Sequence, residues 1–162
     1  MKDTIMIDHE KGMNPYLKFA LMMGTSFLIM YAIMYLNVDR FEHIYIADTR
    51  NYMTALMISA MAIVMLLFMW GMYPKKSMNY AIIGGAGLIF ILCLLGVRNQ
   101  TFVGDVQWMK GMIPHHSIAI MVSKNANLKD PEVVKLAEEI IEAQKREIAQ
   151  MKEMISRLEN QK

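Results

Sequence analysis

The residues with the clearest chemistry lie in the segment MKGMIPHH. On a helix, Met109, Met112 and His116 follow the spacing i, i+3, i+7 and share one face. Met112 and His115 are also three residues apart, so one thioether can serve either imidazole. Adjacent side chains diverge by about 100° on a regular helix, but Pro114 removes a backbone hydrogen bond and can bend the chain. The segment therefore predicts a helical site at which thioether and imidazole groups lie together.

Two more methionines, Met151 and Met154, are three residues apart near the end of the sequence, one turn after Glu147. If the intervening chain folds as an antiparallel hairpin, they return beside Met109 and Met112. Thioether and imidazole ligands without a thiolate suit Cu(I) or Ag(I), whereas imidazole alone also takes Cu(II). The pattern predicts a soft monovalent metal as the cofactor, and no organic cofactor.

Helix packing is the competing explanation for every methionine in this chain. Met makes up 19 of the 162 residues, and its flexible, apolar side chain fills gaps between helices. One row of methionines recurs mostly at four-residue steps: Met53, Met57, Met61, Met65, Met69 and Met72. Such steps drift by about 40° each around a helix, so the row forms a broad band and not a single line of ligands. We expect the band to pack helices, with a soft-metal path through the membrane as the less favoured alternative. His43 lies near three acidic residues and is a candidate accessory ligand, but we expect it to be a solvated loop residue.

The sequence offers little for catalysis or for nucleic-acid binding. Its only cysteine, Cys93, lies in an apolar run, which excludes a Cys-based zinc or iron–sulfur site. The acidic group Glu138, Glu139 and Glu142 lacks the Glu-x-x-His pairs of di-iron bundles. A net charge of +2 gives no basic field for nucleic acid. We therefore expect a protein that is not an enzyme and has no nucleic-acid partner.

These residues must be positioned by a chain that has the composition of a membrane protein. Hydrophobic residues make up 55% of the sequence, charged residues 20%, and the mean hydropathy is +0.26. Three apolar stretches, residues 17–36, 52–73 and 80–97, are long enough to cross about 30 Å of hydrocarbon as helices. The first is longer than a signal-peptide core, so we expect it to remain in the mature protein. The fold class is therefore an all-α membrane protein with three transmembrane helices in contact with the lipid bilayer.

Residues 98–162 have the pattern of two helices joined by a turn. Asp105 is the expected N-cap of the first helix, which fades at Asn125. Asp130 and Pro131 mark the start of the second, and apolar residues then recur at three- and four-residue spacing up to Leu158. Two helices bury little surface alone, so we expect this hairpin to complete a bundle by oligomerisation or to pack onto the membrane helices.

Basic residues predict the orientation across the membrane. The first loop, between the first two apolar stretches, has two basic residues, Arg40 and Arg50. The N-terminal flank and the loop before the third stretch, which lie on the other side of the membrane, have five: Lys2, Lys11, Lys18, Lys75 and Lys76. The positive-inside rule makes residues 1–16 a cytoplasmic N-terminal tail, residues 17–97 the transmembrane region, and residues 98–162 an extracytoplasmic metal-binding domain. In a bacterium with two membranes, these are the inner membrane and the periplasm.

The stretch from DVQWMKGMIPHH through LAEEIIEAQKREIAQM resembles a bacterial family of domains of unknown function, number 305, placed among ferritin-like helical folds. The RFEH loop and the following TRNYMTALM are similar to its membrane-anchored branch. The resemblance implies copper and silver binding in heavy-metal resistance, with copper-handling proteins as partners. Carried over by position, it implies these metal ligands: His115, His116, Met112, Met109, Met151, Met154 and Met121.

The main expectation from the sequence is sequestration or trafficking of Cu(I) or Ag(I) at the outer face of the inner membrane. The alternative is a structural or adaptor protein whose hairpin associates with other proteins through the seam from Val133 to Leu158, while its methionines only pack. A ferritin-like redox enzyme with an iron or manganese pair ranks last.

Overall fold

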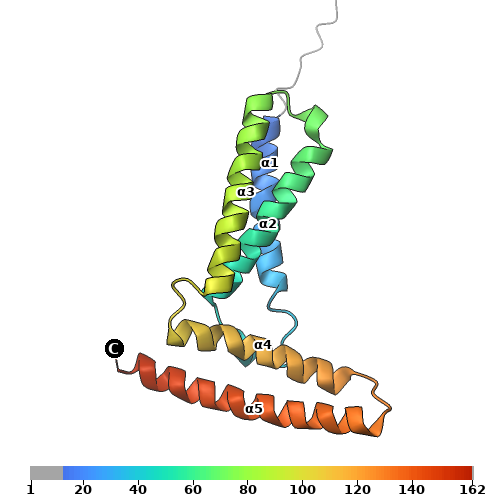
Figure 1. Cartoon of the computed structure of the whole chain (residues 1–162), viewed down its shortest axis with the longest axis vertical. Helices are drawn as coiled ribbons and strands as arrows, with labels where there is room; N and C mark the ends of the chain where they lie inside the picture. Colours follow the sequence, from blue (N-terminus) through green and yellow to red (C-terminus); the bar gives the residue numbers. More distant parts are fainter. Residues whose placement is uncertain (1–12, 162) are drawn as a thin grey trace, which may run out of the picture.

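The structure, a computed structural model, describes residues 13–161 of the chain. Three long helices stand together, and two further helices lie across one end of that group (Figure 1). In chain order the α-helices are α1 (Pro15–Ile33), α2 (Asp48–Phe68), α3 (Lys76–Asn99), α4 (Asp105–Asn125) and α5 (Pro131–Glu159), with two 3₁₀ turns, η1 (Phe41–His43) and η2 (Trp70–Met72), in the connections. The expected all-helical class is confirmed.

The helices α1, α2 and α3 are each long and apolar enough to cross a membrane, with 19, 21 and 24 residues. Much of their apolar surface is exposed, including Leu28, Leu88 and Ile91. Lipid would cover such a surface, and a helix satisfies its own backbone hydrogen bonds there. The three helices therefore suggest a membrane location.

The ends of these helices differ from the expected stretches because local turn residues set them. α1 starts after Asn14, whose side chain accepts a hydrogen bond from the Tyr16 amide at 2.9 Å, and it ends at residue 33 and not 36. α2 starts at residue 48 and not 52, and ends at 68 and not 73, since η2 follows. α3 runs from 76 to 99 and not from 80 to 97, and stops where Gln100 adopts a left-handed φ of 48°.

A small apolar core joins α1, α2 and α3. Its buried residues are Phe19, Met23, Ala62, Leu66, Tyr73 and Ala86. Three methionines of the α2 band, Met61, Met65 and Met69, pack against this core. The band therefore contributes to helix packing, as its broad spread around the helix predicts.

The helices α4 and α5 lie side by side and run in opposite directions (Figure 1). Side chains from both form a second core, made of Met109, Ile113, Ile120, Ile148, Met151 and Ile155. Lys110, near the start of α4, forms an ion pair of 2.7 Å with Glu159 at the end of α5. α4 remains helical through Pro114. One face of α4 is thus covered by α5, and another face is turned toward α1 to α3.

The helix starts show one expected cap and one corrected cap. Asp130 caps α5, as predicted, because its side chain accepts hydrogen bonds from the Glu132 and Val133 amides at 2.9 and 3.1 Å. The prediction for α4 was wrong by one residue: Gly104 is the N-cap and Asp105 lies in the first turn. There its negative charge still favours the positive end of the helix dipole.

Candidate functional site

Met109 and Met151, two of the predicted metal ligands, are packed inside the α4–α5 core. Their side chains are 4% and 7% exposed and lie among the isoleucines of both helices. Met112 is partly buried against the same core. The structure thus brings three predicted thioethers together, but around apolar side chains. Met154 is 45% exposed and Met121 is half-buried, and neither belongs to this core.

His116 is held between α4 and α5 by both of its ring nitrogens. Nδ1 lies 2.9 Å from the Met112 carbonyl oxygen, and Nε2 lies 2.8 Å from Oε2 of Glu147 on α5. Both partners are hydrogen-bond acceptors, and each ring nitrogen lies within hydrogen-bond distance of one of them. In this arrangement His116 ties the two helices together, and both of its nitrogens already have a partner within the protein.

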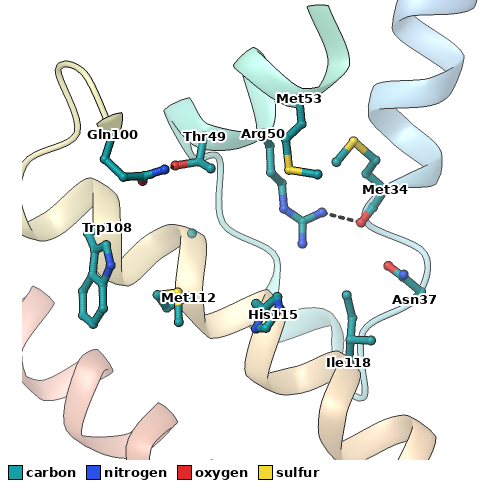
Figure 2. Close-up of a pocket in the computed structure, with 11 residues that line it drawn as sticks. Met34, Asn37, Thr49, Arg50, Met53, Gln100, Trp108, Met112, His115 and Ile118 are labelled. Carbon is teal, nitrogen blue, oxygen red and sulfur yellow. Dashed lines mark hydrogen bonds between the residues drawn. The ribbon is translucent and has the colours of Figure 1, made fainter. Parts of the chain in front are cut away.

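His115 faces a different region, a cavity of about 340 Å³ between α4 and the ends of α1 and α2. Figure 2 shows Met34 and Met53 on the side of the apolar helices, and Met112 and His115 on α4 opposite them. The remaining lining residues are Asn37, Thr49, Arg50, Gln100, Trp108, Gly111 and Ile118. Three thioethers and one imidazole therefore share one cavity, although they come from three helices.

Local structure explains why these four side chains meet. Met34 is the residue at which α1 stops, and Met53 lies in the second turn of α2. α4 passes close to the start of α2 at Gly111, where an added Cβ would lie 3.5 Å from the Ala47 Cβ, in ordinary van der Waals contact. Sequence reasoning placed Met53 in the packing band and did not select Met34. Their positions at the ends of the apolar stretches nearest to the MIPHH helix were the available signal.

A buried cation, Arg50, shares this cavity. Its side chain is 7% exposed, and its Nη1 donates to the carbonyl oxygen of Met34 at the end of α1 (Figure 2). The guanidinium carbon also lies 4.4 Å from the centre of the Tyr35 ring. Both contacts favour a positive charge, the first through the negative end of the helix dipole and the second through the ring face.

The donor set of the cavity fits a soft metal better than a hard one. Within residues 13–161, no three His, Cys, Asp or Glu side chains come together in a way that could hold a metal ion. The cavity instead offers neutral thioethers and an imidazole. Thioethers select Cu(I) and other soft ions over Mg²⁺ or Ca²⁺, which prefer oxygen.

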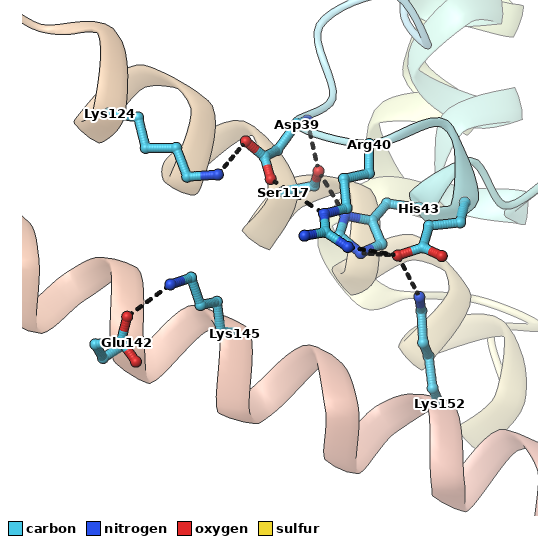
Figure 3. Close-up of polar contacts among 9 residues, drawn as sticks. Asp39, Arg40, His43, Ser117, Lys124, Glu142, Lys145 and Lys152 are labelled. Atoms are coloured by element: carbon cyan, nitrogen blue, oxygen red, sulfur yellow. Dashed lines mark hydrogen bonds and ion pairs between the residues drawn. The ribbon is translucent and has the colours of Figure 1, made fainter.

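His43 is not the solvated loop residue that the sequence predicted, because α4 covers it. Its exposed fraction is 6%, and its Nδ1 lies 2.9 Å from the Ser117 hydroxyl (Figure 3). The Asp39 amide donates to the same hydroxyl at 2.8 Å, so Ser117 links both Asp39 and His43 of the loop to α4. Burial lowers the pKa of His43, and the Lys152 cation acts in the same direction.

Two ion pairs reinforce the attachment of this loop to α4 and α5. Lys124 lies 2.6 Å from Asp39, and Lys152 lies 3.6 Å from Glu42 (Figure 3). The Lys152 cation also lowers the pKa of the exposed Glu42 carboxyl. The loop between α1 and α2 therefore fixes α4 against the ends of α1 and α2, which sets the shape of the cavity.

Comparison with known proteins covers the part of the chain that contains α4 and most of α5. Residues 97–155 match the family described as "Domain of unknown function (DUF305)". The chain is also similar to "Uncharacterized protein L153" of Acanthamoeba polyphaga mimivirus, with 42% identity over 69 residues. That match covers 41% of this chain and 45% of the viral protein, so the chain spans less than half of that relative. No solved structure matches the chain. Met112 and His115 thus lie in a segment that matches this family of unknown function, whereas Met34 and Met53 lie outside the family match.

Proposed function

We propose that the protein binds Cu(I) or Ag(I) in the cavity between α4 and the ends of α1 and α2, for sequestration or trafficking of the metal. In this proposal the three apolar helices anchor the chain in the inner membrane of a bacterium, and the metal is bound without catalysis. Resistance to copper or silver would follow from such binding, and the metal would pass to or from other copper-handling proteins.

The observation that supports the proposal is the shared cavity of Met34, Met53, Met112 and His115. Each of these side chains is a soft or borderline donor, and no thiolate or carboxylate from residues 13–161 lines the cavity. The predicted ligands Met109, Met151 and His116 have a supporting role in this proposal, because they form the contact that holds α4 on α5.

The orientation follows from charge. α3 begins at Lys76, directly after Lys75, at the end of the bundle away from α4 (Figure 1). Because short basic flanks stay in the cytoplasm, that end is cytoplasmic in the proposal. The cavity and the α4–α5 pair then lie outside the cytoplasm, where a protein that sequesters metal before entry would bind it.

The test is a Cu(I) titration of the full chain in detergent against a competing chelator. We expect His115→Ala to weaken binding by about 100-fold or more, since even loss of an outer-shell partner of a metal costs 10- to 100-fold. The matched control is His116→Gln, which changes the neighbouring residue but keeps a donor toward Glu147. Its Cu(I) affinity is expected to stay close to that of the wild type.

Two results would contradict the proposal in different ways. Wild-type binding no tighter than that of His115→Ala rejects a metal site in the cavity. A loss confined to His116→Gln moves the site to the interface of α4 and α5.

A second candidate function, association through α5, has its own supporting observation. The first half of α5 exposes Val133, Leu136 and Ile140, which are 45%, 54% and 36% exposed and share one helix face. A second copy or an adaptor partner would cover this stripe. We expect Leu136→Asp to reduce the oligomer mass measured by light scattering while Cu(I) binding is unchanged; an unchanged mass argues against this interface.

A further inference from the structure

The charge of Arg50 is not balanced by an acidic side chain. Its side chain is 7% exposed, and no Asp or Glu among residues 13–161 forms an ion pair with it. A buried charge without a counter-charge is costly, and at the edge of a membrane such a residue is a mark of a ligand or ion site. Arg50 therefore needs an explanation beyond packing.

Arg50 has more hydrogen-bond donors than its contacts occupy. One nitrogen donates to the Met34 carbonyl oxygen, and the Tyr35 ring faces the guanidinium. The guanidinium has several further N–H donors in a rigid fork. Figure 2 shows this group projecting into the cavity between Met53 and His115.

The metal of the proposed function makes the imbalance larger. Thioethers and neutral imidazole contribute no charge, so Cu(I) or Ag(I) would add a second positive charge beside Arg50. No Asp or Glu from the described part of the chain lines the cavity. Two positive charges in one mostly apolar cavity repel each other.

We propose that the cavity binds the soft metal together with a small anion of the halide class, which Arg50 holds by charge-assisted hydrogen bonds and which is also a ligand of the metal. This inference rests on the proposed function. The pair of metal and halide is neutral, so the cavity gains no net charge when it fills. Space is sufficient, because the cavity of about 340 Å³ exceeds the roughly 30 Å³ that one water occupies in the liquid.

The chemistry of the metal agrees with this assignment. Cu(I) and Ag(I) are soft cations that bind halides readily, and a halide can accept hydrogen bonds while it coordinates the metal. Arg50 thus acts as a selective group: a soft cation with a halide is favoured, and a cation that arrives alone is repelled. Metal uptake by this site is coupled to the anion.

The experiment is a Cu(I) competition titration of the wild-type full chain in chloride and in methanesulfonate, at equal ionic strength. Protein and chelator draw on the same free Cu(I), so chloride complexes in solution affect both equally. We expect the Cu(I) affinity to be about ten-fold higher in chloride, because one hydrogen bond to a charged group contributes about that factor. X-ray absorption at copper, in bromide buffer, should show bromide next to the metal.

Variants locate the effect at Arg50. Arg50→Leu is expected to lose the dependence on the anion, and Arg50→Lys is expected to keep part of it. Arg40→Gln, at a 67% exposed side chain outside the cavity, is expected to keep all of it. If Arg50→Leu does not fold, the wild-type comparison decides alone. Equal affinity in both salts, or a copper site without bromide, overturns the anion and leaves the metal site standing. No Cu(I) binding in either salt overturns both.

Discussion

Two faces of α4 use the same residue type for different purposes. Toward α5, Met109 is 4% exposed and packs with Ile113 and Met151. Met112 packs against the edge of the same core and, with His115, also lines the cavity toward the apolar helices. Met109 and Met112 are only three residues apart, so their difference comes from what covers each face. A sulfur among isoleucines fills space, whereas a sulfur beside an imidazole in a cavity is open to a ligand.

The largest effect that would test this comparison is loss of packing on the α5 face. Ile113 is fully buried, so Ile113→Ala should lower the free energy of unfolding by about 2–5 kcal/mol. Ile118→Ala, on the cavity side, should cost much less because the cavity leaves that side chain partly uncovered. Denaturant unfolding followed by circular dichroism measures both variants. If both variants lost the same free energy of unfolding, the two faces of α4 would be equally well packed, and the difference between them would be wrong.

The next largest effect is the loss of Cu(I) affinity when a single thioether sulfur is removed. Replacing Met by Leu keeps the volume of the side chain and removes the thioether. Met34→Leu or Met53→Leu should weaken Cu(I) binding by about ten-fold, equal to about 1.4 kcal/mol. The control pair, Met109→Leu and Met151→Leu, should leave the affinity within about two-fold, as expected of a side chain that only packs. Weaker binding in the control pair alone would place the metal in the α4–α5 core.

The sequence predicted the elements well where the signal is local. The apolar stretches correspond to α1, α2 and α3, and Asp130 with Pro131 marks the start of α5, because capping depends on neighbours in the chain. The MIPHH segment was selected correctly as a helix, but which of its residues face one another across helices could not be derived from helical spacing.

The parts that sequence reasoning missed depend on contacts between distant residues. His43 is buried because Ser117, 74 residues later, covers and hydrogen-bonds it. Met34 and Met53 join the cavity because the loop between α1 and α2 attaches to α4. No periodicity within one segment reports such a contact, since periodicity shows which residues share a face and not what lies against that face.

A smaller effect is expected from pH, through the contact of His43 with Ser117 of α4. Burial lowers the pKa of His43 below its usual value of 6.5, and Lys152 adds to this, against the opposite influence of Glu42 and Asp39. The unfolded chain then binds more protons than the folded chain, so this residue contributes stability above about pH 6.5 that is lost as pH falls through the folded pKa.

The pH effect is measured as the free energy of unfolding between about pH 7.5 and pH 5, in the wild type and in His43→Gln. The wild type should lose more stability on acidification than the variant, which has no titrating ring at this position. A variant with the same pH dependence as the wild type would assign the effect to other groups.

The smallest expected effect lies at the rim of the α4–α5 contact, where Lys110 and Glu159 form an ion pair of 2.7 Å. The two side chains are 23% and 49% exposed, so water screens the pair and its ordering costs side-chain entropy. A double-mutant cycle of Lys110→Met and Glu159→Gln should give a coupling of about 0.2–1 kcal/mol, well below the cost of Ile113→Ala. Cu(I) affinity should not change, because neither residue lines the cavity. A coupling as large as the Ile113 effect would mean that charge, and not the buried isoleucines and methionines, holds α4 on α5.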